Sequence, residues 1–70
     1  MEEWNTERVA EWLREIGFGA FVRIARAEKV DGIKLKTMEK KYMENVLGIT
    51  KLNMQQKLIL CIEEVIEGKN

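Results

Sequence analysis

Two lysines lie close to the start of the last apolar pattern in the chain. Lys51 and Lys57 stand at the two ends of KLNMQQK, with no acidic residue between them. The N-terminus of an α-helix carries a partial positive charge and several unpaired backbone N–H groups, so two ammonium groups there would add to its attraction for anions. The chemistry that this stretch predicts is attraction of an acidic surface.

Side chains for covalent or metal chemistry are scarce. The sequence has no histidine and no serine, and it holds a single aspartate (Asp31) and a single cysteine (Cys61). A hydroxyl or thiol nucleophile therefore has no imidazole partner, and neither zinc nor calcium ligand spacing appears. We expect a non-catalytic protein without cofactor or metal, in which Cys61 is a buried structural thiol without a disulfide partner.

Length and composition predict one small folded domain. The chain has 70 residues, of which 46% are hydrophobic, and its 12 basic residues balance its 12 acidic ones. A chain this short supports one core, so we expect a single domain over residues 1–70 with its core at about 4–67. No apolar run is long enough to span a bilayer, and MEEWNTER is unlike a signal peptide. We expect no membrane association and an intracellular protein, in the cytoplasm or the nucleus, and leave open whether Met1 is the native start.

Apolar spacing predicts helices throughout the chain. The first is expected over 6–16 with Asn5 as its N-cap, and the second is short and follows the turn at IGFGAF, through Ala27. After the Asp31-Gly32 turn, one helical turn is expected at 33–36 and a further helix at 39–47. The last helix is expected to begin near Leu52 and to be ended by Gly68. One face, which we assign to the interior, is formed by Leu52, Gln55, Ile59, Ile62 and Ile66 and is widened by Met54, Leu58, Cys61 and Val65.

These patterns favour an all-α fold, a compact five-helix bundle. The helices are too short to be stable alone in water, so packing must hold them. The residues expected to form the core are Trp4, Trp12, Phe18, Phe21, Leu35, Leu47, Ile49, Leu58, Ile59 and Ile62. Trp4 precedes the first helix, and we expect it to pack the N-terminus onto the last helix.

Four sequence pieces in a fixed order resemble the sterile alpha motif (SAM) domain family. They are W(x4)V(x2)WL(x2)IGF(x2)F, VDG(x2)L, LGIT and KLIL, and together they extend from Trp4 to about Ile66. The resemblance implies a five-helix bundle whose long last helix packs on the first. It also implies a protein interaction module, because many members of the family pair with another copy of the same fold.

The resemblance implies two candidate binding surfaces. One is the exposed N-terminal end of the last helix, often basic, which we call the end-helix surface; the other is a mid-domain surface around the third and fourth helices, often acidic. In this chain the end-helix surface comprises Lys51, Leu52, Asn53, Met54 and Lys57. Members commonly have glycine and further basic residues where this chain has Asn53, Met54 and Gln55, so the contact is expected to be more apolar and less ionic.

The mid-domain region is basic, which disfavours its pairing with the basic end-helix surface of a second copy. As a second candidate surface it offers Lys34, Lys36, Lys40 and Lys41, so both surfaces would be basic. Like charges oppose association. We therefore expect a monomer or weak oligomer alone, and heterotypic pairing with another SAM domain or an acidic protein surface. Three alternatives remain open: homotypic self-association, lysines that only solvate exposed helices, and binding of an RNA hairpin, which the pI of about 6.3 and the shortage of aromatic residues near these lysines disfavour.

Overall fold

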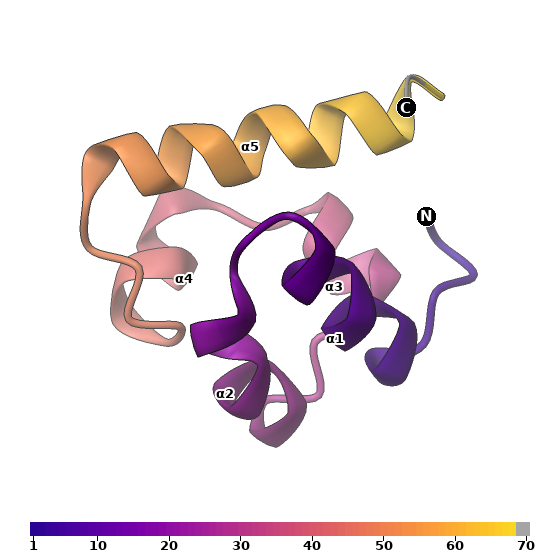
Figure 1. Cartoon of the computed structure of the whole chain (residues 1–70), viewed down its shortest axis with the longest axis horizontal. Coiled ribbons are helices and arrows are strands. Elements are labelled where there is room, and N and C mark those ends of the chain that lie inside the picture. The colour runs from indigo at the N-terminus through magenta and orange to yellow at the C-terminus, as the bar shows by residue number, and fades with distance from the viewer. Residues whose placement is uncertain (69–70) are drawn as a thin grey trace. The chain divides into compact units, whose positions relative to one another are not determined.

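The computed structural model describes residues 1–68, and the described chain is all-α, as the sequence predicts (Figure 1). Within these residues there is no strand. No helix in this range is both long and apolar enough to cross a membrane. The elements are α1 (Thr6–Glu15), a 3₁₀ turn (Gly19–Phe21), α2 (Val22–Ala27), α3 (Gly32–Lys36), α4 (Lys40–Asn45) and α5 (Leu52–Ile66).

The chain divides into two compact units, Met1–Thr37 and Met38–Asn70. The first unit contains α1 to α3. Asn5 caps α1 by accepting a hydrogen bond from the Arg8 backbone N–H, and Asp31 caps α3 by accepting one from Lys34, each at 2.9 Å. The Asp31-Gly32 pair, expected as a turn, thus also begins the short third helix. The predicted packing of the last helix on the first concerns both units and stays a prediction.

The residues before α1 are attached to the start of α3. The Gly32 N–H donates to the Trp4 carbonyl at 2.9 Å, and the Trp4 N–H donates to the Met1 carbonyl at 3.0 Å. Trp4 also meets Trp12 edge to face, with ring centroids 5.8 Å apart, and the Arg8 guanidinium lies 4.5 Å from the centre of its ring. These partners of Trp4 lie in its own unit, and the expected packing of Trp4 on the last helix stays a prediction.

Ile49 connects the two helices of the second unit. Its N–H donates to the Met43 carbonyl of α4 at 2.8 Å, and its carbonyl accepts from the Gln55 side chain of α5 at 2.9 Å. Gly48 makes this turn possible because its φ of 76° lies in the left-handed region that glycine adopts without strain. Ile49 itself is buried, so the linker between α4 and α5 is fixed at its middle.

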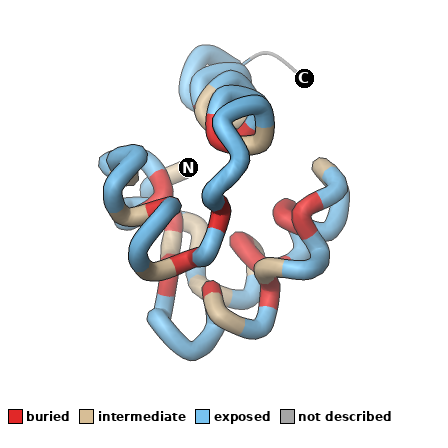
Figure 2. Tube along the Cα trace, turned by 90° about the vertical axis from the view of Figure 1, so that its left-hand side faces the viewer, coloured by how far each residue is buried: buried red, intermediate tan, exposed pale blue. Residues whose placement is uncertain are grey.

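Most of the expected core is buried, and buried residues recur along the chain between exposed ones (Figure 2). The expected core residues that are buried are Trp12, Phe18, Leu35, Leu47, Ile49, Leu58 and Ile62. Three others, Trp4, Phe21 and Ile59, are only half-buried, so this part of the prediction was wrong.

The interior face of α5 also differs from the one expected. Leu52 and Ile66 are 58% and 47% exposed, whereas Gln55, Leu58 and Ile62 are buried. The buried residues keep the expected spacing of three and four positions. The error arose at the ends of the helix, where apolar residues on the same stripe extend beyond the part of the helix that is covered.

Candidate interaction surfaces

The start of α5 presents backbone N–H groups without a side-chain cap. Lys51 is the N-cap residue, in an extended conformation, and its side chain makes no capping hydrogen bond. The N–H groups of Met54 and Gln55 both donate to the Lys51 carbonyl, at 3.1 and 3.0 Å. The N–H groups of Leu52 and Asn53 lie before these two, at positions where a helix offers no carbonyl acceptor of its own. The positive pole of the helix is therefore exposed at this end of α5.

The side chains of the end-helix surface add charge and apolar area to this pole. Lys51, Leu52, Asn53 and Lys57 are exposed, and Met54 is half-buried. Leu52 is 58% exposed, so a large apolar side chain directly follows the N-cap lysine at the surface. The structure therefore brings the predicted residues together on the first two turns of one helix, where they combine a cationic and an apolar character.

The buried side chain of Gln55 attaches this end of α5 to the residues before it. Only 2% of Gln55 is exposed, and its amide nitrogen donates both to the Ile49 carbonyl, at 2.9 Å, and to the Glu44 carboxylate, at 3.1 Å. A buried side chain that satisfies two acceptors orders the groups around it. Sequence reasoning placed Gln55 on the interior face but missed this role, for which the available signal was a polar residue within an apolar stripe.

The lysines of the second candidate surface fall into two groups. Lys34 and Lys36 belong to α3 in the first unit, whereas Lys40 and Lys41 begin α4 in the second, so the structure does not define the four as one surface. Lys34 donates to the Glu28 carbonyl at the end of α2. Lys36 pairs with Glu2, and this hydrogen bond from the ammonium group holds the pKa of the Glu2 carboxyl below its ordinary value.

Those contacts reduce the charge that the α3 lysines can offer to a partner. Lys40 and Lys41 are exposed and have no carboxylate within 4.0 Å among residues 1–68. The cationic character of the second candidate surface thus rests mainly on α4. The start of α4 also lacks a side-chain cap, but its first turn has no exposed large apolar side chain comparable to Leu52 of α5.

Cys61 is half-buried on α5, where full burial was expected. Burial nevertheless raises the pKa of its thiol, and the nearby Glu64 carboxylate acts in the same direction. A thiol with a raised pKa is a poor nucleophile at neutral pH, in keeping with a structural residue.

Short helices with exposed charged residues at their ends are typical of small helical interaction domains. Comparison with known proteins identifies the family. The sequence profile of the SAM domain family (sterile alpha motif) matches residues 1–66, and the chain belongs to this family. Domains of this family are generally non-catalytic protein–protein interaction modules.

A curated relative carries the same kind of domain. The chain is 32% identical over 65 residues to WD repeat, SAM and U-box domain-containing protein 1 of Danio rerio. The match covers 93% of this chain but 13% of that protein, so the chain corresponds to a small part of its relative.

Proposed function

We propose that this domain binds an acidic surface of another protein, most readily a second and different SAM domain, through the end-helix surface. The observation that carries the proposal is the start of α5, which has no side-chain cap and combines the N-cap residue Lys51 with the exposed Leu52. A carboxylate of the partner would receive hydrogen bonds from the backbone N–H groups of this helix start and charge attraction from Lys51 and Lys57.

Leu52 gives this contact an apolar centre. A fully buried leucine contributes about 1.5–3 kcal/mol relative to an exposed one, whereas an exposed ion pair contributes about 0–1 kcal/mol. The apolar contact therefore supplies a large part of the affinity, and the lysines mainly select acidic partners and speed the encounter. This division of roles fits the composition of the end-helix surface. It has two lysines, and at Asn53, Met54 and Gln55 it lacks the further basic residues that members of the family commonly carry.

Binding to a second copy of the same chain is disfavoured by charge. The mid-domain partner surface would present Lys40 and Lys41 to Lys51 and Lys57 of the next copy. Like charges across a contact lower both affinity and encounter rate. Sedimentation or light scattering over a concentration series is expected to show a monomer or a weak oligomer, and a long head-to-tail polymer would contradict this.

Paired charge reversals test the surface. Lys51→Glu/Lys57→Glu is expected to weaken binding to SAM domains with acidic mid-domain surfaces by about tenfold or more, the equivalent of 1.4 kcal/mol, measured by calorimetry. Lys40→Glu/Lys41→Glu changes the charge equally and is the matched control, expected to have a small effect. Equal affinity of the wild type and the Lys51/Lys57 variant would refute the end-helix surface.

The same variants separate protein binding from RNA binding. Phosphate contacts make RNA affinity fall steeply with salt, so a mobility shift with an RNA hairpin at low salt that disappears at moderate salt would favour the RNA alternative. We expect no such complex. Either charge reversal, at Lys51 and Lys57 or at Lys40 and Lys41, would weaken an RNA complex. Only the reversal at Lys51 and Lys57 is expected to weaken binding of the protein partner.

A further inference from the structure

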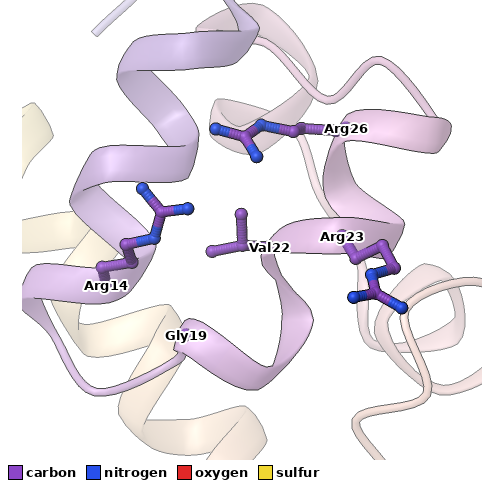
Figure 3. Close-up of a pocket in the computed structure, with 5 residues that line it drawn as sticks. All are labelled: Arg14, Gly19, Val22, Arg23 and Arg26. Carbon is purple, nitrogen blue, oxygen red and sulfur yellow. The ribbon is translucent and has the colours of Figure 1, made fainter.

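A hollow between α1 and α2 in the first unit is lined by three arginines. It has a volume of about 320 Å³, and its walls are formed by Arg14, Gly19, Val22, Arg23 and Arg26. In Figure 3 the guanidinium groups of Arg14 and Arg26 face the space beside Val22 from opposite sides, while Arg23 extends away on the other side of α2's first turn. Arg14 comes from α1 and the other two from α2, so folding brings this charge together.

Within residues 1–68, one of the three arginines is paired with a carboxylate. Arg26 binds Glu7 through two hydrogen bonds, of 2.9 and 3.2 Å, which hold the guanidinium in position. Among residues 1–68, no carboxylate lies within 4.0 Å of Arg14 or Arg23. Three guanidinium groups and one carboxylate leave a formal charge of +2 around the hollow.

We propose that this hollow binds a phosphate monoester group, free or carried on a side chain of another protein. A monoester carries a charge of about −1.5 to −2 at pH 7 and three acceptor oxygens, which match the excess charge and the two facing guanidinium groups. Arg14 and Arg26 would contact the phosphate, and Arg23 would add charge at the rim. The inference is independent of the end-helix surface, which lies on α5.

Gly19 lines the hollow beside the stem of Arg14. A Cβ atom at this position would lie 3.9 Å from Arg14 Cγ, which is an ordinary contact distance. Val22 is buried and closes the bottom with an apolar group. Hydrogen bonds to a phosphate are stronger where water is excluded on one side than on a flat surface.

The surroundings favour an isolated phosphate over a nucleic acid. Glu7, Glu11 and Glu15 are exposed along α1 beside Arg14, with 61–67% of each side chain accessible. A polyanion would have to pass these carboxylates, and like charges repel it, whereas a single phosphate group fills the hollow without reaching further. Preferential binding of a nucleic acid at the hollow would therefore contradict the proposal.

Titration of the whole domain with two phosphate sources tests the site. The probes are inorganic phosphate and a short peptide with one phosphoserine, with chloride and the unphosphorylated peptide as controls. Amide chemical shifts of Gly19 and Val22 are expected to move with saturation for both phosphate probes and not for the controls. Saturation with the peptide at much lower concentration would assign the phosphate to a protein partner, and equal affinities would assign it to a free small molecule.

Two pairs of variants locate the binding atoms. Arg14→Gln is expected to weaken phosphate binding about threefold to tenfold, with a smaller loss for Arg23→Gln at the rim. Glu7→Gln is expected to strengthen binding severalfold, because it removes the carboxylate that competes for Arg26. Glu11→Gln removes the same charge from the same helix without touching Arg26, so it is the matched control and is expected to change the affinity far less.

The proposal fails in three ways that this experiment can show. Shifts that chloride reproduces at the same ionic strength would mean general ion screening only. Equal effects of Glu7→Gln and Glu11→Gln would mean that net charge and not the hollow controls binding. Tighter binding of an RNA hairpin than of the phosphopeptide at moderate salt, lost in Arg14→Gln, would mean that the arginines serve a nucleic acid. Circular dichroism of each variant confirms that the helices remain.

Discussion

Two helices of the first unit, α1 and α3, begin differently from the two helices of the second unit. In the first unit α1 and α3 each start with a short polar side chain, Asn5 or Asp31, that accepts a hydrogen bond from a backbone N–H of the first turn. In the second unit α4 and α5 start at Glu39 and Lys51, and neither side chain makes such a bond. A capping side chain contributes about 0.5–2 kcal/mol, so the second unit forgoes stability that the first unit uses.

Charge in the first turn also distinguishes α1 from α4 and α5. Glu7 lies in the first turn of α1, where a carboxylate is attracted to the helix pole, whereas α4 opens with Lys40 and Lys41 and α5 with Lys51. Cations at a helix N-terminus are unfavourable by a few tenths of a kcal/mol each. The comparison teaches that the starts of α1 and α3 are satisfied by their own side-chain caps, while α5 starts without one and is left available to an external anion.

Gly32→Ala disturbs the start of α3 in the first unit and is expected to lower the stability of the protein the most. A Cβ atom at Gly32 would overlap the Met1 carbonyl and lie 3.0 Å from Cβ of Trp4, so the segment before α1 must move away from α3. We expect a loss of about 3 kcal/mol, at the upper end for overpacking, because the Trp4 hydrogen bond is lost as well. Thermal melting measures it.

Gly19→Ala is the matched control for this substitution. A Cβ there meets only Arg14 Cγ at 3.9 Å, an ordinary contact. Its melting temperature is expected to change by a few degrees at most. Equal losses for the two variants would show that glycine flexibility, and not the close approach of Met1, explains the effect.

Gln55→Ala removes the buried side-chain hydrogen bonds that stabilise the start of α5, which has no side-chain cap. The Ile49 carbonyl would be left without its buried donor and the Glu44 carboxylate without its hydrogen bond. The expected loss is about 2 kcal/mol, which corresponds to roughly 8–16 °C in the melting temperature of a domain this small. Gln56→Ala, at the exposed neighbouring position, should change it by less than about 0.5 kcal/mol. If both variants melt alike, the role assigned to Gln55 is wrong.

Exchanging the caps tests the comparison directly. Asn5→Ala and Asp31→Ala are each expected to destabilise the chain by about 1 kcal/mol, whereas Lys51→Ser, which introduces a capping hydroxyl at α5, is expected to stabilise it by about 0.5–1 kcal/mol. Lys51→Ala, without a hydroxyl, is the control. If binding uses the open N–H groups, Lys51→Ser should also weaken an acidic partner more than Lys51→Ala does, as measured by calorimetry.

Acid is expected to produce the smallest effect, through two carboxyl groups of the first unit. The pKa of Glu2 is lowered by the hydrogen bond from Lys36, and that of Glu3 by a backbone hydrogen bond. A carboxyl whose pKa is lower in the folded state stabilises the fold above its unfolded value of 4.5, and this contribution disappears as the pH falls through the folded pKa. Melting at pH 6 and pH 3 should therefore differ less in Lys36→Gln than in the wild type. An unchanged difference would show that the Glu2–Lys36 pair does not contribute.

Local patterns in the sequence predict the helices well but not all of their environments. The spacing of Val9, Trp12 and Leu13 predicts α1 within one residue, because helix periodicity is a property of adjacent turns. The hydrogen bond from Gln55 to the Ile49 carbonyl depends instead on where the linker passes, which no local pattern contains, and the exposure of Leu52 is not contained in one either. Periodicity shows which residues share a stripe, but not which part of the stripe is covered.

The candidate sites divide in the same way. The end-helix surface is visible in the sequence because its residues are consecutive along the start of one helix. The arginine hollow combines Arg14 with Arg23 and Arg26, and only the spacing of the last two, three residues apart on one helix, gives a local signal. The Lys36–Glu2 pair spans 34 positions and gives none.

Both tryptophans of the chain, Trp4 and Trp12, lie in the first unit, where their rings meet edge to face. Indole emission excited above 295 nm is therefore an optical reporter of Met1–Thr37 alone, and the far-ultraviolet helical signal reports both units. Recording the two signals on one denaturant titration separates concerted unfolding from sequential loss, since coincident curves require that both halves come apart in a single step.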